Sequence, residues 1–163
     1  MTAAPETSPR LLAAAEFYRG AFAWDVEIGE RSLALVLTGG MAAFSVPFHA
    51  KNQHLFSARD AVPPGPLILT PGVPFRVHAL VDASDFVIPD QDLPENVLFH
   101  RPLSKLLLPP TVDTRGAVRW LREPSPQERW LPLAAGVLSA LSRPNRRIAA
   151  YRRRVRRDRN GLS

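Results

Sequence analysis

The chain is organised around Leu103 to Leu121, LSKLLLPPTVDTRGAVRWL. Leu106 to Leu108 are consecutive apolar residues, which is typical of a short strand that is covered on both faces. Pro109 and Pro110 cannot donate to a strand ladder, so pairing is expected to end there. Asp113 to Gly116 provide turn residues, and Gly116 can adopt a positive φ. Ala117 to Leu121 then resume an extended pattern, so the stretch predicts two strands joined by a polar turn.

The other extended patterns follow one another too closely for repeated helical crossovers. They predict strands at Trp24–Ile28, Ser32–Leu37, Met41–Val46 (ended by Pro47), Pro66–Thr70 and Phe75–Val81. Helical spacing predicts helices from Pro9, with Ser8 as N-cap, to Gly20 or Ala21, within Phe48–Asp60, and over Leu131–Leu141. The acidic, proline-containing segment Asp82–Asn96 is expected to be mostly loop. We therefore expect one α+β domain with a mixed or antiparallel sheet over residues 9–142, after a disordered leader at residues 1–8.

Composition narrows the class of protein. The 163 residues and a hydrophobic content of 45% are enough for one core but not for two ordinary domains. The absence of cysteine excludes disulfides, thiolate catalysis and cysteine-ligated zinc. No secretion signal and no apolar run long enough to span a bilayer are found in the sequence. A cytoplasmic location is the expectation.

The positive charge is concentrated at the end of the chain. Residues 143–163 hold nine arginines and one acid, Asp158, which gives +8, so the formal net charge of +6 leaves −2 for residues 1–142. Asn145 to Asp158 are expected to form a basic helix with a narrow apolar stripe at Ile148, Tyr151 and Val155. Guanidinium groups suit phosphates, so we predict a nucleic-acid-binding segment. The predicted contacts are Arg146, Arg147, Arg152, Arg153, Arg154, Arg156 and Arg157. A solubilising tail, docking on the acidic body and an anionic membrane remain alternatives.

Several segments, in order, resemble the prim-pol domain of bifunctional DNA primase/polymerases, of the archaeo-eukaryotic primase superfamily. A helix leads into Trp24-Asp25-Val26, where the family has Gly-Trp-x-Val. Thr38-Gly39 leads into Ala42–Pro47, where the family has Thr-Gly before a strand with Asp-x-Asp. The segment from Leu67 to Gly72 and on to Arg76 matches the family's Thr-Pro-Ser-Gly-Gly-x-His, and Leu106–Trp120 matches its Pro-Pro-Ser, Gly turn and aromatic-x-Trp strand. The resemblance covers about residues 12–121 and implies a prim-pol fold.

The departures from the family pattern bear on function. The resemblance implies that the paired aspartates of active members hold two divalent cations, yet this chain has Ser45 and Pro47 at those places. The family's phosphate-contacting histidine falls on Arg76, and a third aspartate would fall near Leu98 or Pro102. We therefore expect no catalytic residues, no metal and no cofactor. This predicts a catalytically degenerate domain that binds nucleic acid, with a replication or regulatory protein as a further candidate partner.

Other interpretations remain open. An active primase or polymerase would need Mg²⁺ or Mn²⁺ held by displaced carboxylates such as Asp82, Asp85 or Asp90, but Asp90-Gln91-Asp92 and Glu95 lie in a predicted loop. Asp85 is more simply a turn cap. The histidines share no ligand spacing that supports a metal site; they are His49, His54, His78 and His100. A serine hydrolase elbow and a phosphate loop are absent, and a short likeness of residues 16–19 to glyoxalase-type domains lacks metal ligands. A protein-interaction module that binds no nucleic acid is the remaining alternative.

Overall fold

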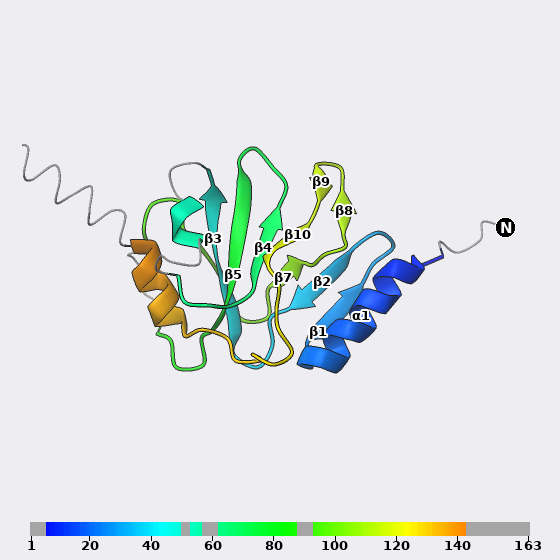
Figure 1. Cartoon of the computed structure of the whole chain (residues 1–163), viewed down its shortest axis with the longest axis horizontal. Helices are drawn as coiled ribbons and strands as arrows, with labels where there is room; N and C mark the ends of the chain where they lie inside the picture. Colours follow the sequence, from blue (N-terminus) through cyan, green and yellow to red (C-terminus); the bar gives the residue numbers. More distant parts are fainter. Residues whose placement is uncertain (1–5, 50–52, 57–61, 88–92, 143–163) are drawn as a thin grey trace, which may run out of the picture.

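A computed structural model of the chain describes residues 6–49, 53–56, 62–87 and 93–142. It shows an α+β architecture in which the paired strands of all three sheets run antiparallel, as expected. In Figure 1, helix α1 and the small sheet beside it lie at one end of the molecule. The five-stranded sheet lies in the middle, and a helix at residues 134–142 lies at the other end.

Helix α1 spans Pro9–Phe22, with Ser8 at the N-cap and proline in the first turn, as predicted. The Ser8 carbonyl accepts hydrogen bonds from the backbone N–H groups of Leu11 and Leu12. The helix continues past the predicted end at Gly20 or Ala21. It stops where Ala23 adopts the left-handed conformation, with a φ of 55°. Glycine at position 20 was therefore a misleading end signal.

Two sheets build the body. The first has the order β1-β2-β7, and the second has the order β10-β4-β5-β3-β6. The bounds of the first are β1 Asp25–Ile28, β2 Leu33–Val36 and β7 Lys105–Leu107. Those of the second are β3 Met41–Phe48, β4 Leu67–Thr70, β5 Phe75–Asp82, β6 Leu98–His100 and β10 Arg119–Arg122. A hairpin of β8 Val112–Asp113 and β9 Gly116–Ala117 links β7 to β10.

The stretch around the two prolines connects the sheets as its sequence suggests. Pairing of β7 stops before Pro109, and Thr111 then reaches back to β2. The Thr111 side-chain oxygen accepts a hydrogen bond from the backbone N–H of Leu33 at 2.8 Å and donates to its carbonyl at 3.2 Å. Gly116 has a φ of 140°, which confirms that this turn uses the conformational freedom of glycine.

One local prediction is wrong. Pro47 does not end its strand, because β3 runs to Phe48 and pairs with β5 throughout. Proline is tolerated there because, among the described residues, β6 pairs with β3 only at Ala43 to Ser45. Strand β6 itself was not predicted. Of the helix expected within residues 48–60, the described part shows one short 3-10 helix, η1 at Gln53–Phe56.

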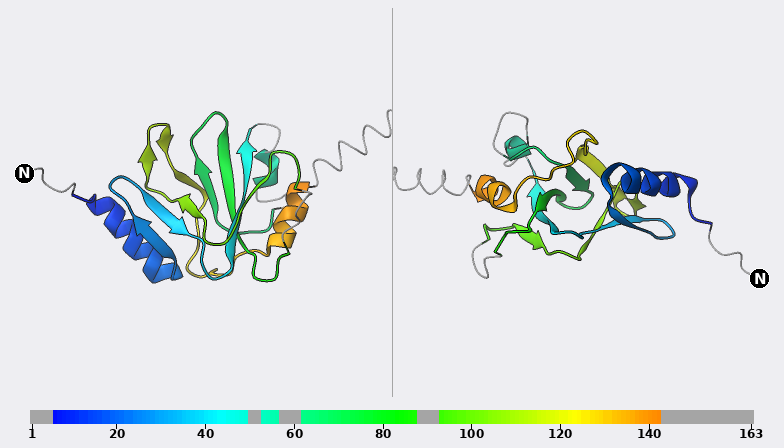
Figure 2. Two further views of the ribbon diagram at one scale, coloured as in Figure 1. Left: turned by 180° about the vertical axis from the view of Figure 1, so that it is seen from behind. Right: turned by 90° about the horizontal axis from the view of Figure 1, so that it is seen from below.

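The five-stranded sheet is covered on both faces. Alternate residues of β3, represented by Phe44, pack with η1 and with the helix at residues 134–142 in one core cluster. Residues that project from the other face of this sheet, such as Ala43 and Leu80, pack with α1 and the three-stranded sheet in a second cluster. Figure 2 shows α1 and the helix at residues 134–142 at opposite ends in both further views. Within the described residues, no helix combines the length and apolar character needed to cross a membrane.

Candidate functional site

The positions singled out by the resemblance lie on one face of the five-stranded sheet. Ser45 on β3 pairs directly with His78 on β5, and Pro47 pairs with Arg76 two residues further along. On its other side Ser45 pairs with Leu98 on β6. Directly opposed residues project to the same face of a sheet with their Cβ atoms about 5 Å apart. Ser45, Pro47, Arg76 and Leu98 therefore form one group, although they are up to 53 residues apart in the chain.

Ser45 is the centre of a hydrogen-bonded chain of side chains. Its Oγ lies within hydrogen-bond distance of His78 Nδ1, and 2.6 Å from Nε2 of His100. The other ring nitrogen of His78 lies 2.9 Å from Thr70 Oγ1 on β4. Four strands thus contribute one polar side chain each. We call Thr70, His78, Ser45 and His100 the serine–histidine cluster.

Burial makes this cluster a closed network rather than a surface feature. Ser45 is fully buried and His78 is 8% exposed, while Thr70 and His100 are half-buried. A hydroxyl has one proton, so Ser45 can donate to only one imidazole and accepts from the other. The donor and acceptor roles within the serine–histidine cluster are therefore linked, because the direction of one hydrogen bond sets the direction of the next. Such a network fixes the orientation of both rings.

The electrostatics keep the two imidazoles uncharged. Burial lowers the pKa of His78 from 6.5 to about 4, and the neighbouring His100 and Arg76 act on it in the same direction. Burial and the charge of Arg76 also lower the pKa of His100. Arg76 Nη2 donates to the backbone carbonyl of Ser45 at 3.3 Å, which holds the guanidinium beside the cluster. At neutral pH the only charge in this group is that of Arg76.

The residues present do not fit the two-cation centre that the resemblance implies for active relatives. The Ser45 hydroxyl is already bonded to two imidazoles, and the ring of Pro47 has no donor atom for a metal. Among the residues that the structure describes, no three His, Cys, Asp or Glu side chains gather as a metal site. Ser45 is also too buried to attack an external substrate.

The displaced carboxylates lie elsewhere. Asp82 is at the far end of β5 from Arg76, and its Oδ1 accepts hydrogen bonds from the Ser84 backbone N–H at 2.9 Å and the Ser84 hydroxyl at 2.6 Å. These hydrogen bonds lower the pKa of Asp82. Asp82 therefore forms the turn-capping hydrogen bonds that the sequence suggested for Asp85.

Several predicted residues lie outside the described residues. They are Asp90, Asp92 and the C-terminal arginines from Arg143 onwards. The side chain of His54 is likewise not described, and His49 is exposed on the segment after β3.

His78 and His100 were not predicted from the sequence as partners of Ser45. His78 lies two residues after Arg76 on β5, a strand that the sequence predicts correctly. Residues two apart on a strand project to the same face, so the sequence was sufficient to place these two side chains together. Their approach to Ser45 depends on the strand register, and His100 also depends on β6.

We also compared the chain with known proteins: no family model matches it, and neither a curated protein nor a solved structure matches it.

Proposed function

We propose that this chain is a primase/polymerase-like domain without metal-dependent nucleotidyl transfer, and that it binds nucleic acid through its C-terminal arginines. The observation that carries the binding part is the separation of charge. Residues 143–163 have a net charge of +8, whereas residues 1–142 have −2. Arginine-rich segments neutralise phosphates and release counterions, which gives affinity that is largely independent of base sequence.

The loss of catalysis is supported by the side chains at the centre of the five-stranded sheet. Nucleotidyl transfer by a two-cation mechanism requires carboxylates that bridge the metal ions. In the resemblance, Ser45 and Pro47 stand where active members have their paired aspartates. The Ser45 hydroxyl is also already hydrogen-bonded to the imidazoles of His78 and His100. The two features together favour a domain that retains a nucleic-acid partner but not the reaction.

The binding part is tested by fluorescence anisotropy with a labelled single-stranded oligonucleotide across a salt series. The wild-type chain should bind at low salt, and its affinity should fall steeply as salt rises. Replacing five C-terminal arginines by glutamine removes up to five phosphate contacts; they are Arg152, Arg153, Arg154, Arg156 and Arg157. With about 0.7 counterions released per contact, the slope of log K against log salt should become shallower by up to about 3.5.

A matched control removes the same charge from the body. Five arginines that are exposed in the structure are changed to glutamine instead: Arg31, Arg101, Arg115, Arg119 and Arg129. This variant has the same net charge as the C-terminal variant, but its C-terminal segment is unchanged. It should therefore keep most of the wild-type slope of log K against log salt. Absence of wild-type binding at low salt, or an equal loss of slope in both variants, would contradict the proposal.

The catalytic part is tested separately by nucleotide incorporation on a primed template with Mg²⁺ or Mn²⁺. We expect no extension by the full chain. Extension that disappears on Asp82→Asn or Asp85→Asn would refute this part and identify displaced metal ligands.

A further inference from the structure

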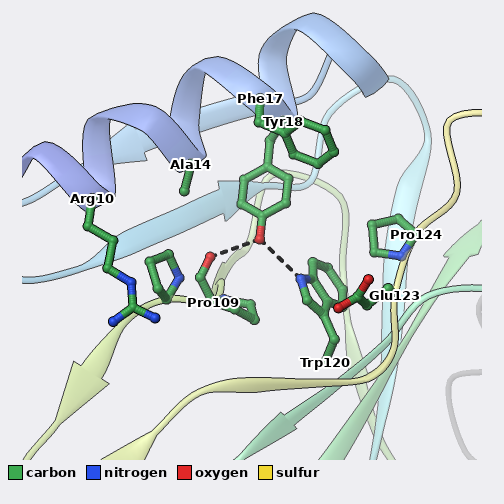
Figure 3. A pocket seen from close by; sticks show the side chains of 9 residues that line it. Arg10, Ala14, Phe17, Tyr18, Pro109, Trp120, Glu123 and Pro124 are labelled. Carbon is green, nitrogen blue, oxygen red and sulfur yellow. Dashed lines mark hydrogen bonds between the residues drawn. The ribbon is translucent and has the colours of Figure 1, made fainter.

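A pocket of about 350 Å³ lies between α1 and the proline-rich connection to the sheet. Figure 3 shows its side chains, which come from α1, from the turn after β7 and from the end of β10 and beyond. The lining residues are Arg10, Ala14, Phe17, Tyr18, Pro109, Pro110, Trp120, Glu123 and Pro124. Its volume is at the lower end of the roughly 300–1,000 Å³ of small-molecule sites. The serine–histidine cluster contributes no residue to it.

The polar groups in the middle of the pocket are already satisfied. The Tyr18 hydroxyl donates to the carbonyl of Pro109 at 2.9 Å and accepts a hydrogen bond from Trp120 Nε1 at 3.1 Å. Both dashed lines meet at this hydroxyl in Figure 3. An occupant therefore meets ring and proline surfaces there.

The apolar surface that remains available is aromatic. Phe17 is 52% exposed although it packs edge-on against Tyr18 and Phe22, with ring centroids 5.8 Å apart in both pairs. Trp120 is half-buried and is held by its hydrogen bond to Tyr18. An exposed phenylalanine at the edge of a pocket is a stacking surface for a flat ring.

Charged groups of opposite sign stand at the two ends of the pocket. Figure 3 shows Arg10 at one end and Glu123 beside Trp120 at the other, with Tyr18 between them. Arginine offers donors and a carboxylate offers acceptors. A ligand that matches this arrangement has a flat apolar face and an edge with both acceptors and donors, which is the chemistry of a nucleobase.

We propose that this pocket binds one unpaired base of a single-stranded nucleic acid, stacked on Phe17. This inference rests on the proposed function, because it presupposes a nucleic-acid partner. It adds that single strands are preferred, since a paired base is not free to enter the pocket. The helix at residues 134–142, which precedes the arginine segment in the sequence, lies at the opposite end of the molecule from α1 (Figure 1). Phe17 lies on α1, whereas the arginines of the proposed phosphate contacts are all in residues 143–163, so the two kinds of contact can be mutated separately.

The test compares two labelled strands of equal length, a thymidine oligonucleotide and an abasic sugar-phosphate strand, by fluorescence anisotropy with the full chain. The wild-type protein should bind the base-containing strand roughly 10-fold more tightly, which is within the range for stacking of one base on an aromatic side chain. Phe17→Ala and Phe17→Leu should both abolish this preference and leave the affinity for the abasic strand unchanged. Phe17→Tyr should retain the preference, because the ring is kept.

Leu12→Ala is the matched control, since Leu12 lies on the same helix, is 43% exposed and is not part of the pocket lining. It should behave as the wild type. Equal binding of both strands by the wild-type chain overturns the pocket inference and leaves the proposed function standing. The pocket inference is also overturned if Phe17→Leu keeps the preference. Binding of neither strand overturns both proposals.

Discussion

Acidification should destabilise this protein through His78. The pKa of His78 is lowered from 6.5 to about 4, chiefly by burial, so the folded chain resists a proton that the unfolded chain accepts. Stability linked to this group is fully present above pH 6.5 and is lost as the pH falls from there toward 4. From these two pKa values, the free energy of unfolding should fall by about 2 kcal/mol between pH 7 and pH 5, and by about 3 kcal/mol between pH 7 and pH 4. The lowered pKa of His100 acts in the same direction.

The assay is urea unfolding of the full chain at pH 7 and pH 5, followed by far-UV circular dichroism. His78→Gln removes the titrating ring, and we expect it to remove most of the difference between the two pH values. It should also be less stable than the wild type at pH 7, because the hydrogen bonds to Ser45 and Thr70 are disturbed. The midpoint of thermal unfolding should follow the same pattern, with about 2 kcal/mol corresponding to roughly 4–8 °C.

Val77→Ala controls for loss of stability alone. Val77 is fully buried next to His78 and has no titratable group, so this variant should be destabilised but keep the wild-type difference between pH 7 and pH 5. If wild type and His78→Gln lose the same free energy on acidification, His78 is not the group responsible, and our account of the cluster is wrong.

Three further predictions concern stability, each measured as the change in free energy of urea unfolding at pH 7. Tyr18→Phe removes both hydrogen bonds of the hydroxyl that lines the pocket and should cost about 1–2 kcal/mol; a variant as stable as the wild type would contradict this. Thr111→Val leaves the backbone N–H of Leu33 without its 2.8 Å acceptor and should cost about 1–3 kcal/mol, whereas Thr111→Ser should restore most of it. Gly116→Ala places a side chain at a φ of 140° and should cost about 1–3 kcal/mol, an expectation that an unchanged midpoint would refute.

Much of the strand and turn pattern could be predicted because its signals are local. The hydrophobic run before Pro109 predicted β7, the glycine at 116 predicted a turn with positive φ, and Ser8-Pro9 predicted the start of α1. Local signals also failed where tertiary contacts outweigh them. Pro47 is compatible with a strand because its neighbour strand β6 has ended, which no feature of the surrounding residues indicates.

The candidate site was predicted in part. Ser45, Pro47 and Arg76 were selected by resemblance, and they do share one face of the sheet. The spacing of the histidines along the chain gives no metal-site signal, and it does not indicate which of them meet across strands, because that depends on strand register. His78 and His100 are separated by 22 positions, and both reach the same serine hydroxyl.

The amino-acid order alone was enough to predict the α+β class with a mixed or antiparallel sheet, the places where many of the strands and helices begin, and the separation of a basic C-terminal segment from an acidic body. These properties follow from the period of apolar residues, from turn residues and from charge, all of which act over a few neighbouring positions. The serine–histidine cluster and the aromatic pocket below α1 exist only after folding. Each joins residues from distant elements, and strand register and packing determine which side chains meet.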